Sequence, residues 1–201
     1  MASILTDLKN TIIAGVVLAI ILVLILMGTH GEGYSNTYEW WAFFFRWLHV
    51  LSGVMWIGIL WYFNFVQIPN MPNIPDEQKP AISKVIAPAA LFWFRWGAMS
   101  TIITGLILAW MNGYLVEAYA LGLTGGGAKA TTIGIGMWLG TIMWFNVWFV
   151  IWPNQKIALG IVSSEEGAAP KAARTAMLFS RTNTMLSIPM LFAMVAAQNI
   201  V

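Results

Sequence analysis

The chain has 201 residues, of which 59% are hydrophobic and only 9% are charged. A soluble domain of this size could not cover so much apolar side-chain area with polar surface, so the composition indicates an integral membrane protein. The formal net charge of +2 is too small to indicate a nucleic-acid partner, and the lack of cysteine excludes disulfides, thiol catalysis and thiolate metal sites.

Five apolar stretches are long enough to cross a membrane. A spanning helix needs about 20 residues for roughly 30 Å of hydrocarbon, and because hydrocarbon offers no partner to unpaired backbone groups, each stretch is expected to be helical. The stretches are residues 11–28, 40–63, 93–112, 132–152 and 176–197. The sequence therefore predicts an all-α integral membrane fold with five transmembrane helices. We divide it into an amino-terminal helix with an outer loop, residues 1–38, and a membrane domain, residues 39–201.

The basic residues of the expected connections indicate an orientation. Loops on the cytoplasmic side of a membrane carry an excess of Lys and Arg. One set of connections holds Lys9, Lys79, Lys84, Lys156, Lys171 and Arg174, whereas the other set holds only Lys129. The amino terminus is therefore predicted to lie inside and the carboxyl terminus outside.

The connection after the second stretch is rich in proline. It reads IPNMPNIPDEQKP and contains Pro69, Pro72, Pro75 and Pro80. Because proline fixes φ and has no amide hydrogen, we expect an extended, stiff connector here rather than a helix.

A short pattern occurs twice in the chain. MWIGILWYFN at residues 55–64 aligns without gaps with MWLGTIMWFN at residues 137–146, and each copy runs on to a Pro-Asn pair. Two such hairpins would form a four-helix bundle with a pseudo-twofold axis, with repeat halves at about residues 39–112 and 132–197. A tryptophan-rich match of this length can also arise by chance. If the repeat is genuine, the interface between its halves is the natural place for a site.

Two ionisable residues lie in an otherwise apolar segment, RWLHVLSGVMWIG, residues 46–58. At about 1.5 Å per residue, His49 would lie roughly 15 Å deep, with Arg46 one turn nearer the outer surface. Ionisable residues at such depth usually face the bundle interior and mark functional sites. Ser52 and Gly53 leave the surface beside the imidazole small, which suits a flat cofactor or a closely packed helix.

Two interpretations of His49 stay open. In the first, it is an axial ligand of haem b, and Arg46 pairs with a propionate. In the second, His49 bonds to a neighbouring helix and Arg46 extends toward the surface. The position that matches His49 in the second half is Thr131, and His30 is expected in the outer loop, so a second face of the haem would need Met, water or another subunit.

Further buried polar groups are expected toward the inner side. Asparagines bonding across helices and arginines at the headgroup level explain them most simply, and an anionic-ligand site is the alternative. These residues are Asn64, Asn146, Arg95 and Arg181. Gly136 and Gly140 form a GxxxG pattern that permits close helix contact.

The motifs together resemble a known family. RWLHVLSGVMWIG, LWYFNF, LFWFRWGAMST, NVWFVIWPNQK and SRTNTMLSIPMLFAM are similar to successive segments of the amino-terminal membrane domain of the bacterial membrane-bound urate oxidase (urate hydroxylase) family, over roughly residues 40–197. In that family a cytochrome c domain follows, and urate oxidation is coupled to electron transfer. The resemblance implies a multi-pass protein of the bacterial inner membrane. More remotely, the chain is similar to small membrane haem proteins, including the four-helix protoporphyrinogen oxidase.

The chain departs from the family pattern at several positions. It has no C-x-x-C-H motif for covalent haem c, and Phe92, Thr182 and Gln198 stand where the family has histidine. The resemblance therefore implies the fold more directly than urate oxidation by this chain alone; if the chain is an enzyme, a membrane oxidoreductase is expected.

Two functions from different classes follow. One is an electron-transfer subunit that holds haem b or a quinone and passes electrons to a separate cytochrome. The other is a non-catalytic, structural or accessory subunit of a larger membrane complex. In either case the expected partners are membrane lipid and other membrane subunits.

Overall fold

The computed structural model describes residues 2–30 and 37–201, and gives only the backbone of Ala2, Ser3 and His30. Helices are the only regular elements in this part of the chain. Most of the outer loop expected before residue 39 lies outside the described residues. The chain forms two compact units, residues 1–44 and 45–201, and each is described by itself.

The first unit contains one long apolar helix. A short helix, α1 (Ala2–Leu5), precedes α2 (Leu8–His30), and the first turns of α3 (Tyr38–Trp61) also belong to this unit. The helix α2 includes the first predicted stretch, so the prediction of a helix there is confirmed. Asp7 accepts a hydrogen bond from the amide of Asn10 at 2.9 Å, which satisfies one amide of the first turn.

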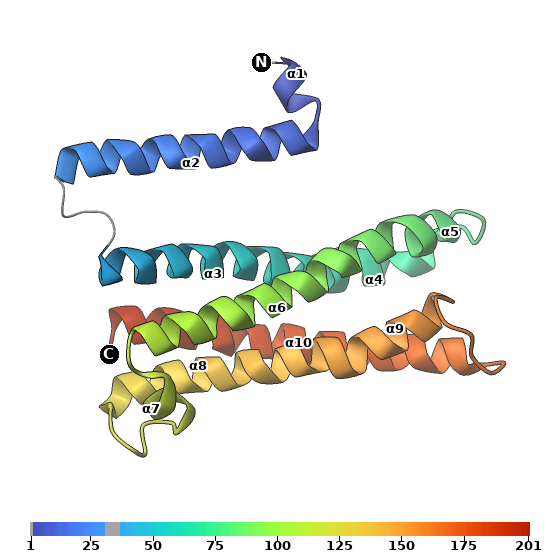
Figure 1. Ribbon diagram of the computed structural model, residues 1–201. Coiled ribbons are helices and arrows are strands. Elements are labelled where there is room, and N and C mark those ends of the chain that lie inside the picture. The colour runs from blue at the N-terminus through green and yellow to red at the C-terminus, as the bar shows by residue number, and fades with distance from the viewer. Residues whose placement is uncertain (1, 31–36) are drawn as a thin grey trace. The chain divides into compact units, whose positions relative to one another are not determined.

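The second unit is built from long helical segments that run along one another (Figure 1). The rest of α3 continues through a π-helical segment, Tyr62–Gln67, into α4 (Ile68–Asn70), and α5 (Lys79–Ala81) leads through a second π-helical segment, Ile82–Ile86, into α6 (Ala87–Met111). A short α7 (Leu115–Tyr119) precedes α8 (Gly127–Phe145), a third π-helical segment, Asn146–Ile151, and α9 (Trp152–Ala158). The last helix is α10 (Ala168–Asn199).

Each π-helical segment ends two residues before a proline. The amides of Ile68, Ala87 and Trp152 donate to carbonyls five residues earlier. The residues that follow them are Pro69, Pro88 and Pro153. Proline cannot donate to the carbonyl four residues before it, and its ring crowds that carbonyl, so a widened turn before it keeps the helix continuous.

The prediction of an extended proline-rich connector was wrong over most of its length. Residues 68–73 and 79–81 are helical, so only residues 74–78 form the turn between them. Pro69, Pro72 and Pro80 lie at the first or second position of short helices. An amide hydrogen is not needed there and the fixed φ suits the helix, so the prolines start helical turns.

The core of the second unit joins both hairpins. Its fully buried large side chains include Trp56 and Leu60 of α3, Phe94 of α6, and Met143 of α8. Met190 of α10 packs in the same cluster. The residues that form the core therefore come from all four long helices.

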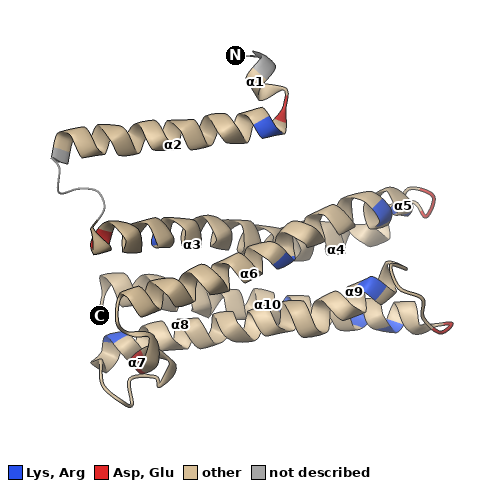
Figure 2. Cartoon of the chain, viewed as in Figure 1, with Lys and Arg blue, Asp and Glu red and all other residues tan. Residues whose placement is uncertain are grey.

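The described residues hold four helices that are long and apolar enough to cross a membrane, so this is a multi-pass membrane protein. They cover Leu8–Thr29, Tyr38–Asn73, Lys79–Met111 and Gly127–Ala158. The fifth predicted stretch is helical, within α10, but it does not reach the same apolarity, because α10 carries a row of polar residues. In the second unit, Lys and Arg gather at the end where α5 and α9 lie (Figure 2).

Candidate functional site

The imidazole of His49 lies at the contact between α3 and α6. Its Nδ1 atom is 2.9 Å from the carbonyl oxygen of Thr101 and 3.4 Å from the hydroxyl of Thr104. The ring covers Gly105, where an added Cβ would lie 2.9 Å from His49 Cε1. His49 is half-buried. The ring therefore fills a gap that Gly105 leaves and ties the two helices together.

The bond to Thr101 determines which ring nitrogen carries the proton. A carbonyl oxygen can only accept, so Nδ1 of His49 donates to it and the lone pair of the neutral ring lies on Nε2. No residue in the described part of the chain bonds to Nε2. Histidines that bind metals commonly have this arrangement, with the other nitrogen held by a backbone carbonyl. The orientation of the ring thus fits an axial ligand.

A row of small residues on α6 lets α3 approach closely. Gly97, Thr101 and Gly105 follow at four-residue spacing, and an added Cβ on Gly97 would lie 3.3 Å from the backbone nitrogen of Trp56. Small residues at this spacing typically form helix contacts in membranes. The sequence indicated a close contact at Gly136 and Gly140, but this longer row was not predicted, although its four-residue spacing is visible in the sequence.

Ser52 lies in a groove one turn from His49, and the surface at Gly53 is open. The groove has a volume of about 230 Å³ and is lined from α3 by Leu51, Ser52 and Met55, and from α6 by Trp93, Trp96, Gly97 and Ser100. No heavy atom lies within 4 Å of an added Cβ on Gly53. Two of the residues expected beside a cofactor therefore border free space.

Arg46 is exposed and does not share the contacts of His49. Its positive charge acts instead on Tyr114, which follows α6. Burial raises the pKa of the Tyr114 hydroxyl above its ordinary value, and the charge of Arg46 works in the opposite direction. Arg46 therefore belongs electrostatically to the end of the bundle that α7 covers.

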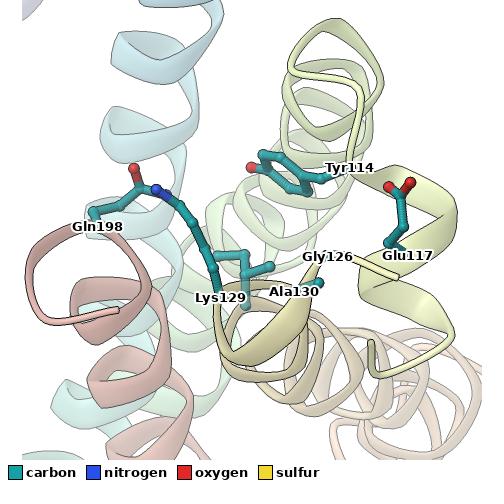
Figure 3. Close-up of a pocket in the computed structure, with 7 residues that line it drawn as sticks. Tyr114, Glu117, Gly126, Lys129, Ala130 and Gln198 are labelled. Carbon is teal, nitrogen blue, oxygen red and sulfur yellow. The ribbon is translucent and has the colours of Figure 1, made fainter. Parts of the chain in front are cut away.

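A small cavity lies at this end of the bundle (Figure 3). Its volume is about 90 Å³, and its polar lining comes from Tyr114, Glu117, Lys129 and Gln198. Such a volume is far below that of sites for drug-sized ligands, which begin at roughly 300 Å³.

Asn64 and Asn146 are both buried and both bond to α10. The Nδ2 atom of Asn64 donates to the hydroxyl of Ser180 at 2.8 Å, and that of Asn146 donates to Oδ1 of Asn183 at 2.9 Å. Asn183 in turn donates to the carbonyl of Met143 at 2.9 Å. Each asparagine thus joins a π-helical segment to α10.

The row of buried polar residues on α10 was not predicted from the sequence. Ser180, Asn183 and Ser187 are buried, and Ser187 accepts a hydrogen bond from Nε1 of Trp61 at 3.0 Å. Their spacing of three and four residues marks one helical face. The signal was in the sequence, but it lay within a stretch that was treated as uniformly apolar.

Arg95 and Arg181 have different surroundings. The guanidinium of Arg95 stacks on Trp152, with Cζ 3.3 Å from the ring centroid, and Lys156 Nζ lies 5.7 Å from the same centroid. Nε and Nη1 of Arg95 are buried without a hydrogen-bond partner among the described residues. Arg181 is exposed on α10. The stacking stabilises the cation in place of a carboxylate.

Of the four residues expected beside a cofactor, His49 and Ser52 lie along the α3–α6 contact, Gly53 borders open surface, and Arg46 acts on Tyr114 instead. The polar residues expected toward the inner side lie elsewhere: Asn64 and Asn146 bond to α10, and Arg95 stacks on α9. In the described residues, no group of three or more His, Cys, Asp and Glu side chains could hold a metal ion.

Residues 114–199 match the model of the urate oxidase N-terminal family. The resemblance expected from the sequence is confirmed over these residues, which contain α7, α8, α9 and α10. His49 and α3 lie outside the match. No curated protein and no solved structure matches the chain.

Proposed function

We propose that this chain, with its urate oxidase N-terminal region, is a membrane electron-transfer subunit that offers His49 to the iron of a haem b. The observation that carries the proposal is the orientation of the imidazole. Nδ1 is held by the carbonyl of Thr101, and Nε2 is left with its lone pair and without a bond to any described residue.

Two further features, at Thr101 and Gly53, support such a group, whereas Arg46 does not lie beside His49. Bound haem would supply a one-electron carrier within the membrane. Thr101 fixes the tautomer and orientation of His49 through a backbone atom, so this support is independent of the side chain at position 101. The open surface at Gly53 would leave room for a flat molecule beside the ring. The second axial position would be filled by Met, water or another subunit.

The proposed membrane topology completes this function. We place the amino terminus inside, the carboxyl terminus outside, and the last four spanning helices in a pseudo-twofold bundle in the bacterial inner membrane. Lys and Arg gather at the end of the bundle where α5 and α9 lie (Figure 2), which supports the proposal that this end faces the cytoplasm. Electrons would pass from this chain to a cytochrome partner.

The second candidate function is a non-catalytic subunit of a larger membrane complex. It is favoured by the packing role of His49, whose ring covers Gly105. The bonds of Asn64 and Asn146 to α10 also hold helices together and place no reactive group at a cavity. In this case the fold would serve contacts with partner subunits.

The absorption spectrum of the purified protein separates the two candidates. The protein is extracted in mild detergent, and oxidised and reduced spectra are recorded for the unchanged chain and for the His49→Ala and His49→Gln variants. The redox function predicts a Soret band, with α and β bands on reduction, that both variants lose. Size-exclusion profiles show whether each variant keeps its fold.

Thr182→Ala is the matched control, because Thr182 is exposed on α10 and its hydroxyl bonds only within its own helix. Its spectrum should equal that of the unchanged protein. A colourless protein, isolated from its native membrane together with its partners, would overturn the haem proposal. The second candidate function, a non-catalytic subunit of a membrane complex, would then be favoured. Spectra that survive in both His49 variants would assign the haem to another ligand.

A further inference from the structure

The groove between α3 and α6 combines apolar side chains with hydroxyls. Its lining contains two hydroxyls, those of Ser52 and Ser100, one on each helix, and no charged side chain. Most serine and threonine hydroxyls in spanning helices bond to a backbone carbonyl of the preceding turn. Thr101 and Thr104 of α6 do so, with distances of 2.7 and 2.6 Å.

Ser52 and Ser100 do not share this arrangement. Within residues 37–201, neither hydroxyl has a hydrogen-bond partner. A hydroxyl without a partner is costly in hydrocarbon. The hydroxyls of Ser52 and Ser100 line the same groove. They can therefore donate hydrogen bonds to a ligand that carries acceptor atoms.

The walls of the groove are aromatic and held by neighbouring rings. The indole of Trp96 meets that of Trp148 edge to face, with centroids 5.5 Å apart, and the indole of Trp93 meets Phe92 in the same way at 5.5 Å. The floor is Gly97, where α6 lies close to the backbone of Trp56. Both indoles are about half exposed, and indole walls with a floor that lacks a side chain suit a flat ring.

Depth and volume restrict the ligand further. The spanning helices cover Tyr38–Asn73 and Lys79–Met111, and the groove lies near the middle of both. The ester groups of phospholipids lie at the membrane surface, outside the hydrocarbon. A volume of about 230 Å³ is below that of sites for drug-sized ligands, so it would admit a single ring rather than a large macrocycle.

We propose that this groove binds the ring of a membrane-soluble quinone, with the hydroxyls of Ser52 and Ser100 donating to its carbonyl oxygens. A quinone is neutral, flat, soluble in hydrocarbon and equipped with acceptors, as the lining requires. The isoprenoid chain would leave the groove past Leu51 and Met55, which are exposed toward the lipid. The proposal extends the redox function proposed above, but no contact of the groove involves His49.

A photoreactive short-chain benzoquinone tests the site in the full chain, reconstituted in lipid nanodiscs. After illumination, labelled peptides are identified by mass spectrometry, and an unreactive benzoquinone competes. We expect competed labels within residues 51–55 and 93–100. In the Ser52→Ala/Ser100→Ala double variant, binding should weaken about thirtyfold, the factor that corresponds to two ordinary hydrogen bonds. Thr182→Ala should bind as the unchanged chain does.

A second variant keeps the test independent of the serines. Leu51→Trp would fill the groove from an exposed position without removing a buried contact, and it should abolish competed labelling. Labels that spread over all lipid-facing helices, or that persist in both variants, would overturn the proposal. So would displacement of the quinone by a photoreactive phospholipid, which would show a lipid site. A colourless chain that still shows competed labels within residues 51–55 and 93–100 would overturn the haem proposal alone, so its failure is distinguishable from failure of this one.

Discussion

The Nδ1 atom of His49 and the carbonyl oxygen of Thr101 lie 2.9 Å apart, and this bond joins α3 to α6 halfway along the bundle. It is possible because Gly105 has no side chain, since an added Cβ would lie 2.9 Å from His49 Cε1. The position of the imidazole thus depends on a glycine 56 positions later in the chain (105 minus 49). A polar group and a missing side chain together determine how closely these two helices approach.

Replacing this glycine should disturb the bundle. In Gly105→Ala, the added methyl group forces the His49 ring or α3 outward, and we expect a loss of about 1–3 kcal/mol in the free energy of unfolding. Gly58→Ala is the control, because nothing lies within 4 Å of the added Cβ, and alanine there should be neutral or stabilise by about 0.5–1 kcal/mol. Unfolding by denaturing detergent measures both; equal stabilities would contradict the proposed contact.

The hydrogen bond between Asn146 and Asn183 should contribute measurably to stability. Either alanine substitution leaves a buried amide without its partner, which costs about 1–3 kcal/mol. The double-mutant cycle should give a coupling of about 0.6 kcal/mol, the average for such pairs in a membrane, with an upper value of about 1.7 kcal/mol. A cycle between Asn146 and the exposed Thr182 should give no coupling. Coupling of the same size in both cycles would show that the effect is not specific to the bond.

Much of the fold could be predicted from the sequence because the bilayer restricts it. Apolar length predicted every long helix, including the one that contains His49, since a spanning segment has no alternative to helical backbone bonds. The ends of the helices were harder to predict from the sequence. Pro69, Pro72 and Pro80 start helical turns, which depends on their position in the turn and not on their number.

The candidate site was predicted less completely, because residue type does not reveal which neighbour a side chain meets. His49 stood out as an ionisable residue, but its partner is a backbone carbonyl, which no sequence pattern marks. Ser52 was singled out as a small residue, whereas its hydroxyl lines a groove that exists only once α6 is in place. Asn64 and Asn146 were expected to bond across helices, and the choice of α10 as their partner required the packed structure.

The close contact of α7 with α8 should depend on Gly134. An added Cβ at this position would overlap the carbonyl oxygen of Ala118, which is rigid backbone, so Gly134→Ala must displace α7. We expect faster hydrogen exchange and proteolysis over residues 113–126, together with a lower free energy of unfolding. Gly140→Ala is the control on the same helix, because nothing lies within 4 Å of its added Cβ. Unchanged exchange in Gly134→Ala would contradict the docking of α7 at this position.

The titration of Tyr114 should report the integrity of the end of the bundle that α7 covers. Burial raises the pKa of its hydroxyl above the ordinary value of 10.0, so the folded chain keeps the proton to higher pH than the unfolded chain does. Its contribution to stability is therefore complete below about pH 10 and is lost as the pH rises through the raised pKa of the folded state.

Two variants separate the causes of this shift. Tyr114→Phe should remove the decrease in the free energy of unfolding that Tyr114 causes at alkaline pH. It should also remove one tyrosine titration, at high pH, from the ultraviolet absorbance of tyrosinate. In Arg46→Gln, the pKa of Tyr114 should rise further, because the positive charge that favours the phenolate is gone. An unchanged or lower pKa in Arg46→Gln would show that Arg46 does not act on Tyr114. Together the two variants test whether the residue one turn from His49 acts at the bundle end rather than beside the imidazole.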